Sequence, residues 1–161
     1  FAQVRMGLAS GPMIVGNMGS RGRVDYTMMG DTVNLAARFE SGQKLYGTSI
    51  MINDLIYDQV VDLVETRKLD LIQVMGKEEP VTAYEVLDLK GELNPQKKEV
   101  LEIYGKAMNA YEAFEFDLAR AQFQEALKVD PSDGPSALYA DRCEEYALDP
   151  PEDLVFRAQS K

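Results

Sequence analysis

The sequence predicts an α+β fold in which a sheet-containing half precedes an all-helical segment. Short apolar runs alternate with helical segments over residues 1–90, whereas apolar residues recur every three or four positions over residues 91–161. Between these halves, residues 90–96 combine Gly, Asn and Pro without an apolar period, which is typical of a linker. With 161 residues, 45% of them hydrophobic, the chain suits one ordinary domain or two small ones.

The first half carries the sheet. Six short runs are apolar and are bounded by turn residues, and we expect strands at 4–9, 13–15, 24–29, 49–52, 67–74 and 81–87. We expect one helix over 32–43 with Asp31 as its N-cap, and another over 54–64 that Asn53 or Asp54 would cap. The last two strands are close enough in sequence to form a hairpin-like pair. This mixture of elements favours an α+β or α/β sandwich.

The second half is predicted to be helical. Apolar residues with a period of 3.6 indicate helices over 97–113, 116–129 and 136–146, and prolines follow the last two. Four residues are spaced as in the second half of a tetratricopeptide repeat (TPR): Ala119, Phe123, Ala126 and Pro131. Because a solenoid needs about three repeats to bury a core, we expect this TPR-like tail to pack on the first half or on a protein partner.

Composition excludes several kinds of site. The chain has no histidine and a single cysteine, so Ser-His-Asp and Cys-His nucleophiles, zinc sites rich in cysteine and an internal disulfide are all excluded. The net charge of −10 makes nucleic acid an unexpected partner. Residues 91–161 carry seven units of this net negative charge. The simplest interpretation is that their acidic side chains form a solvated face.

The chain shows no targeting signal. It begins with Phe1 and has neither a signal peptide nor an apolar run long enough to span a bilayer. We therefore expect a soluble cytoplasmic chain, and we expect it to be a piece of a longer protein. That longer protein could still be anchored to a membrane through upstream segments.

One stretch combines residues suited to phosphate chemistry. Asn34 and Arg38 are four residues apart on a predicted helix and therefore share a face, where an amide and a guanidinium can hold a phosphate oxygen. Thr27, on the preceding strand, could bond the edge of a ligand. The alternative is a solvated helix face with Arg38 paired to Glu40 or Asp31. The glycine-rich turn at 16–19 is no Walker A loop, because no GK[ST] follows it.

Four segments resemble the C-terminal half of a class III nucleotidyl cyclase catalytic domain, which has a ferredoxin-like sheet. They are RMGLASGP (5–12), VGNMG (15–19), DYTMMGDTVNLAAR (25–38) and VMGKEEPVTAYE (74–85). The third segment is highly specific, and the resemblance covers residues 4–88. The tail, with Arg142-Cys-x-x-Tyr146 and a following Pro-Pro pair, is similar to the extension after this domain in some bacterial adenylate cyclases.

The resemblance implies roles for four residues. Asn34 would orient the ribose, and Arg38 would stabilise charge on the transferring α-phosphate. Thr27 occupies the position that selects the purine and favours ATP over GTP. A basic residue between the last two strands contacts the terminal phosphates in this family. Met75 stands at the first family lysine position and Lys77 follows two residues later, so Lys77 is the candidate for this contact.

The resemblance also implies groups that this chain does not carry. The family binds two Mg²⁺ or Mn²⁺ ions through two aspartates, which are expected upstream of Phe1, as is the lysine that contacts adenine. Its active sites form between two subunits, so a second cyclase subunit in a homodimer is the expected partner. We therefore expect this chain to hold half of a composite site for ATP, with no metal ligands of its own, and to be inactive alone.

Two competing interpretations remain from the sequence. The chain could be a non-catalytic, cyclase-like dimerisation module whose tail docks a protein partner. The chain could instead belong to a guanylate cyclase, which Thr27 disfavours.

Overall fold

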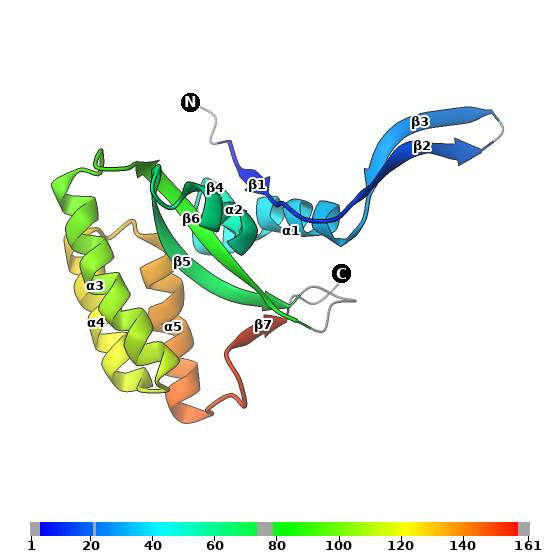
Figure 1. Ribbon diagram of the computed structural model, residues 1–161. Helices are drawn as coiled ribbons and strands as arrows, with labels where there is room; N and C mark the ends of the chain where they lie inside the picture. Colours follow the sequence, from blue (N-terminus) through cyan, green and yellow to red (C-terminus); the bar gives the residue numbers. More distant parts are fainter. Residues whose placement is uncertain (1–3, 21, 74–78, 158–161) are drawn as a thin grey trace.

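A five-stranded mixed sheet forms the centre of the molecule in the computed structural model, which describes residues 4–20, 22–73 and 79–157 (Figure 1). Its strands, in spatial order, are β1 (Met6–Leu8), β4 (Ile50–Asn53), β6 (Val81–Leu89), β5 (Val64–Gln73) and β7 (Val155–Arg157). The pairs β1–β4 and β5–β7 are parallel, and the other two pairs are antiparallel. The predicted α+β fold class is confirmed.

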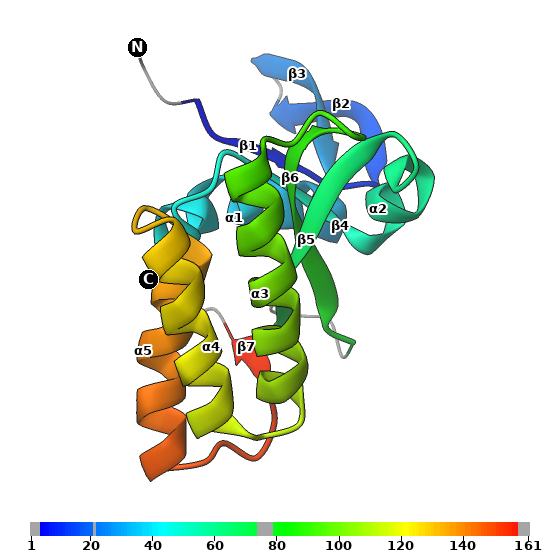
Figure 2. The ribbon, with the colours of Figure 1, turned by 90° about the vertical axis from the view of Figure 1, so that its left-hand side faces the viewer.

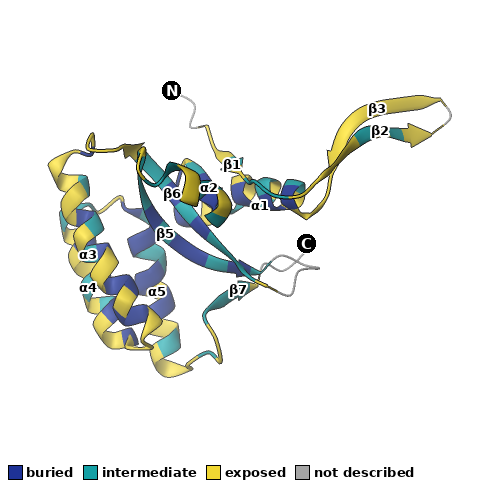
Figure 3. Cartoon of the chain, in the orientation of Figure 1, coloured by how far each residue is buried: buried dark blue, intermediate teal, exposed yellow. Residues whose placement is uncertain are grey.

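A separate hairpin of β2 (Ile14–Ser20) and β3 (Arg23–Met29) extends away from the sheet, at the right in Figure 1. All of β3 is exposed, as the yellow ribbon in Figure 3 shows. The sequence predicts only a short first strand here and a polar loop after it. Cross-strand bonds carry the pairing out to Ser20 opposite Arg23, although these residues have little strand propensity of their own.

Helix α1 (Asp31–Tyr46) packs on the sheet through Leu35, Phe39 and Tyr46, which are buried in the first hydrophobic core. The predicted N-cap at Asp31 is wrong, because Gly30 holds the cap position without a side-chain bond and Asp31 is already helical.

Helix α2 (Asp54–Val60) is shorter than predicted, because the chain turns back at Val64 to begin β5. We expected a side chain of Asn53 or Asp54 to cap this helix, and neither side chain does so. Asn53 holds the N-cap position, but its side chain bonds the backbone of Ser10 instead. A contact over 43 residues has therefore replaced a local cap.

Three helices form the tail: α3 (Pro95–Glu112), α4 (Phe116–Val129) and α5 (Gly134–Leu148). They stand side by side, as Figure 2 shows, around an aromatic core that includes Tyr104, Tyr111, Phe123 and Tyr139. Asn94 caps α3 by accepting from the backbone of Lys97 at 2.8 Å, and Asp133 caps α5 by accepting from Ser136 at 3.2 Å.

The tail packs on the sheet. Strand β7, which the sequence does not predict, pairs with the edge of β5. The hydroxyl of Tyr104 on α3 donates to the backbone oxygen of Lys68 on β5 at 3.0 Å, and Tyr139 on α5 donates to Leu69. The tail was expected to pack on the first half or on a protein partner, and it packs on the first half. The TPR-like character of the tail and a domain boundary between 90 and 91 both stay predictions. None of the helices in the described part combines the length and apolarity needed to cross a membrane.

Two glycines make a matched test of the packing between the tail and α1. A Cβ on Gly134 would lie 2.2 Å from the carbonyl oxygen of Tyr46, whereas a Cβ on Gly105, in the exposed middle of α3, meets nothing within 4 Å. We expect Gly134→Ala to lower the free energy of unfolding by about 1–3 kcal/mol, the range for overpacking. Gly105→Ala should raise it by up to about 1 kcal/mol through helix propensity. Urea unfolding of the chain measures both, and a neutral Gly134→Ala would show that the two backbones are not in contact.

Candidate active site

The first half of α1 presents the predicted phosphate-binding pair. Asn34 is exposed and Arg38 is half-buried one turn later. The alternative pairing of Arg38 is wrong, because Glu40 pairs instead with Arg5 at 3.4 Å and Asp31 forms no ion pair within the described residues. In that same part of the chain no carboxylate pairs with Arg38, so its guanidinium is available to an anionic ligand.

Glycines hold α1 at the start and along one side. Gly30 has a φ of 137°, and its carbonyl accepts from the backbone of Val33 and Asn34 at 3.1 and 3.2 Å, which turns the chain from β3 into α1. A Cβ on Gly7 would lie 2.2 Å from the carbonyl oxygen of Ala36, so β1 runs directly against the backbone of α1. Sequence reasoning missed this role of Gly7, although a glycine inside a strand is a signal of close backbone approach.

Thr27 lies on β3, opposite Gly16, on the strand that leads into α1. It is exposed, and within the described residues no hydrogen bond joins it to Asn34 or Arg38. Lys77 lies outside the residues that the structure describes. The structure therefore brings Asn34 and Arg38 together on one helix and places Thr27 on the exposed hairpin strand β3, which precedes that helix in the chain.

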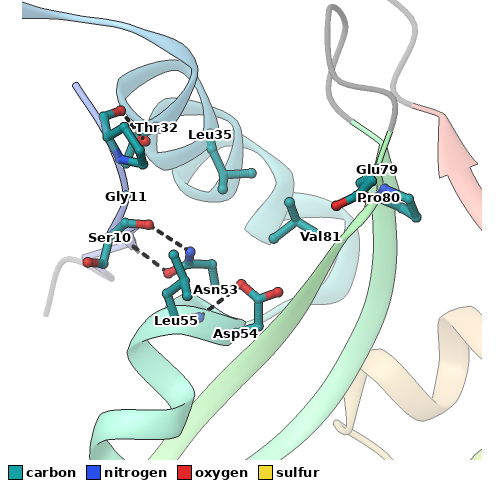
Figure 4. A pocket seen from close by; sticks show the side chains of 11 residues that line it. Ser10, Gly11, Thr32, Leu35, Asn53, Asp54, Leu55, Glu79, Pro80 and Val81 are labelled. Carbon is teal, nitrogen blue, oxygen red and sulfur yellow. Dashed lines mark hydrogen bonds between the residues drawn. The ribbon is translucent and has the colours of Figure 1, made fainter. Parts of the chain in front are cut away.

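A cavity of about 570 Å³, open to solvent, lies beside this site (Figure 4). Its lining comes from four segments: Ser10–Pro12, Thr32 with Leu35, Asn53–Leu55 and Glu79–Val81. Asn34, Arg38 and Thr27 are not part of it. Its walls include the carboxylates of Asp54 and Glu79, which would repel a triphosphate. The cavity is therefore not where the predicted residues would bind a nucleotide.

An apolar surface borders the candidate site. On β1, on the hairpin and on the segment before β1, nine large apolar side chains are each more than 40% exposed: Val4, Met6, Leu8, Ile14, Val15, Val24, Tyr26, Met28 and Met29. In the described part of the chain, β1 is paired along one edge only, with β4. Exposed apolar side chains gathered beside a free strand edge are typical of a surface that other protein covers.

The described residues do not fit a two-metal site by themselves. Within 4–20, 22–73 and 79–157, no three acidic or cysteine side chains converge as metal ligands would. Two-metal chemistry needs such carboxylates around both ions.

Comparison with known proteins gives a family for the chain. The sequence model described as the adenylate and guanylate cyclase catalytic domain matches residues 2–88. The chain is 33% identical over 144 residues to a terminal-differentiation-specific adenylate cyclase of Dictyostelium discoideum, a match that covers 86% of this chain and 7% of the relative. It is 36% identical over 92 residues to adenylate cyclase 1 of Rhizobium meliloti, covering 57% of this chain and 14% of the relative.

A solved structure is also similar. The crystal structure of the adenylyl cyclase CyaB from P. aeruginosa is 37% identical, with a TM-score of 0.46, over 56% of this chain and 45% of that one. The chain thus spans less than half the length of these relatives. The Dictyostelium match extends well beyond residue 88, so part of the tail is shared with that protein. On the match over residues 2–88, the chain belongs to the adenylate and guanylate cyclase catalytic-domain family.

Proposed function

We propose that this chain supplies the ribose- and phosphate-binding half of an adenylate cyclase active site, in a cytoplasmic enzyme of signal transduction that converts ATP to 3′,5′-cyclic AMP and pyrophosphate. The observation that carries the proposal is the pair on α1, an exposed amide and a guanidinium without a carboxylate partner in the described residues, one turn apart. The relatives named as adenylate cyclases support ATP as the substrate.

The reaction gives each of these residues a defined task. The ribose 3′-oxygen attacks the α-phosphorus, and the 3′-hydroxyl gives up its proton, which ends on solvent or on the pyrophosphate. The bond from the α-phosphorus to its bridging oxygen breaks as pyrophosphate leaves. Asn34 orients the ribose by hydrogen bonding. Arg38 donates to the α-phosphate oxygens, where negative charge shifts during the transfer, and so stabilises the transition state more than the bound substrate. Lys77 would contact the terminal phosphates.

The remaining groups are proposed to come from outside this chain. Two aspartates upstream of Phe1 would bind Mg²⁺ or Mn²⁺. A second cyclase subunit would complete the site in a homodimer. The exposed apolar surface on β1 and on the hairpin supports both ideas, because upstream strands and a partner subunit would each cover part of it. The longer protein that contains this chain is called the complete cyclase below.

Nucleotide preference tests the proposal. Because Thr27 is a small hydroxyl side chain at the position that selects the purine in this family, we expect the complete cyclase to form cyclic AMP from ATP, with GTP as a poor substrate and a weak competitor. Cyclic nucleotide and pyrophosphate should appear in equal amounts. Competition between ATP and GTP, with both cyclic products measured, decides the point. A higher kcat/KM for GTP would assign the chain to a guanylate cyclase.

The same apolar surface also favours a second candidate, a non-catalytic dimerisation module with a docking tail, since such a module needs the surface but not the chemistry. The residues that precede Phe1 separate the two candidates. Two aspartates in the expected strand and hairpin indicate an enzyme, and their absence indicates the module.

A further inference from the structure

The tail reaches the C-terminal end of α1, the helix that carries Asn34 and Arg38. This end is closed by Gly47, which adopts the left-handed conformation at a φ of 67° and donates to the carbonyl of Gln43 at 2.8 Å. Gly134, the first residue of α5, packs against the same point, since a Cβ there would lie 2.2 Å from the carbonyl oxygen of Tyr46. The backbones of α1 and α5 are therefore in direct contact.

A buried triad adds polar bonds to this contact. Tyr46, the last residue of α1, donates its hydroxyl to Asp70 Oδ2 on β5 at 2.7 Å. Arg142 on α5 donates from Nη1 to the same oxygen at 2.8 Å. The other oxygen of Asp70 accepts from the backbone of Leu71 at 2.9 Å, so both oxygens of this 3% exposed carboxylate are bonded. One carboxylate thus joins the end of α1 to the tail.

Aromatic contacts and the protonation of Tyr46 stabilise the triad. The guanidinium of Arg142 lies 4.8 Å from the ring centre of Tyr139 and 5.5 Å from that of Phe156, so aromatic rings of α5 and β7 hold it in place. Burial, together with the charge of Asp70, raises the pKa of Tyr46 well above its usual range. The tyrosine hydroxyl therefore remains a protonated donor at any working pH of an enzyme.

The location of the triad gives it a consequence for the site. Tyr46 is eight residues beyond Arg38, about 12 Å along the helix axis. At its other end α1 follows the exposed hairpin and has no side-chain cap. A helix is stiff, so the anchor at Tyr46, together with the contact of Gly7 with Ala36, sets the direction in which α1 points. A misplacement of about 1 Å at a reacting group can lower a rate about 100-fold.

We propose that the tail positions the site helix, with Arg142 and Asp70 holding Tyr46 so that Asn34 and Arg38 are aimed at the nucleotide. This inference rests on the proposed function. Tyr46, Asp70 and Arg142 are positioning residues that do not touch the substrate. The helical tail then positions the catalytic helix even though the tail lies outside the family match at 2–88.

Two tyrosine variants of the complete cyclase separate positioning from stability. Tyr46→Phe removes one hydroxyl from the triad and leaves Asp70 bonded to Arg142, so it should fold. Tyr104→Phe is the matched control. It removes a buried hydroxyl that donates to Lys68 at 3.0 Å, where the tail contacts β5 rather than the end of α1. Both should lower Tm by a similar few degrees.

The proposal predicts different kinetics for the two variants. Tyr46→Phe should lower kcat roughly tenfold with KM for ATP unchanged, whereas Tyr104→Phe should leave kcat within twofold. Equal kcat values in both variants, well below their Tm, would overturn the positioning role.

Amide hydrogen exchange on the same proteins tests the anchor without relying on activity. Tyr46→Phe should speed exchange over residues 39–46, and Tyr104→Phe should speed exchange in α3 but not there. Unchanged exchange over 39–46 in Tyr46→Phe would also overturn the proposal. If instead the unaltered complete cyclase makes no cyclic AMP, the proposed function fails, while the exchange measurement still decides whether the tail fixes the end of α1.

Discussion

Replacing Arg38 by alanine in the complete cyclase is expected to lower kcat about 100-fold or more. This is the scale found when one donor to a developing oxyanion is removed, because the charge at the reacting centre then loses a partner that was placed in advance. The half-buried position of Arg38 and the lack of a carboxylate partner in the described residues mean that its removal leaves no buried charge behind. Folding should therefore be unaffected, and KM for ATP should change little by comparison.

Lys44→Ala is the matched control for this change. Lys44 is an exposed basic residue on the same helix, and no ion pair holds it in the described part of the chain. Its removal should leave kcat within about twofold, which shows that the loss in Arg38→Ala comes from a specific donor rather than from net charge. A loss under about threefold in Arg38→Ala, far below the scale for an oxyanion donor, would contradict the assigned role.

Replacing Arg67 by alanine is expected to lower the free energy of unfolding of the chain by about 3–5 kcal/mol, the range for removing one partner of a buried ion pair. Arg67 on β5 is 6% exposed and donates to Glu85 on β6 at 2.5 Å and to Asp133, the N-cap of α5, at 2.8 Å. Its removal would leave Glu85 without its partner. Asp133 would keep Lys97 at 2.8 Å but lose its buried neighbour.

Burial and neighbouring charges shift the pKa values of the two carboxyl groups in this cluster in opposite directions. Burial acts to raise the pKa of Asp133, but bonds from Arg67 and Lys97 outweigh it and hold that pKa well below its usual range. For Glu85, burial outweighs the attraction of Arg67 and raises the pKa. Asp133 therefore contributes stability above the ordinary pKa of an aspartate, 3.8, and this contribution is lost as the pH falls through its lowered pKa. Glu85 acts in the opposite direction, because its stabilising effect belongs to the low-pH side.

Urea unfolding measures the effect of Arg67→Ala, with Lys128→Ala as the control. Lys128 pairs with Glu125 at 2.5 Å on the exposed face of α4, so its loss should change the free energy of unfolding by less than about 1 kcal/mol. Because Arg67 and Asp133 stand on opposite sides of the predicted boundary at residue 90, both halves should unfold in one transition. An Arg67→Ala variant as stable as the Lys128→Ala variant would mean that the ion pair does not join the halves.

Local patterns in the sequence predict much of the fold. Helix α4 has the bounds 116–129 that its apolar period predicts, and the strands of the first half lie close to the expected runs. These features depend on residues within a few positions of one another. Strand β7 was missed because it has three residues and gains its stability from pairing with β5, more than 80 positions earlier. The Asp31 cap failed for a similar reason, since the turn is set by the backbone at Gly30.

The candidate site also combines local features that the sequence predicts with long-range contacts that it does not. Asn34 and Arg38 follow from a spacing of four on a helix, and the structure places them on one turn of α1, while their roles stay predictions. The contact of Gly7 with Ala36 and the triad of Tyr46, Asp70 and Arg142 join residues 24 to 72 positions apart. A periodic pattern carries no information on such pairs, because each partner taken alone has the properties of an ordinary strand or helix residue.

Cyclic AMP formation by the 161-residue chain and by the complete cyclase, measured side by side with ATP and Mn²⁺, is the most direct test of the half-site. If the chain holds half of the active site, the complete cyclase forms cyclic AMP and the chain alone gives no more than a blank. Turnover by the chain alone would show that it holds a whole active site, and a complete cyclase without turnover would show that it holds none.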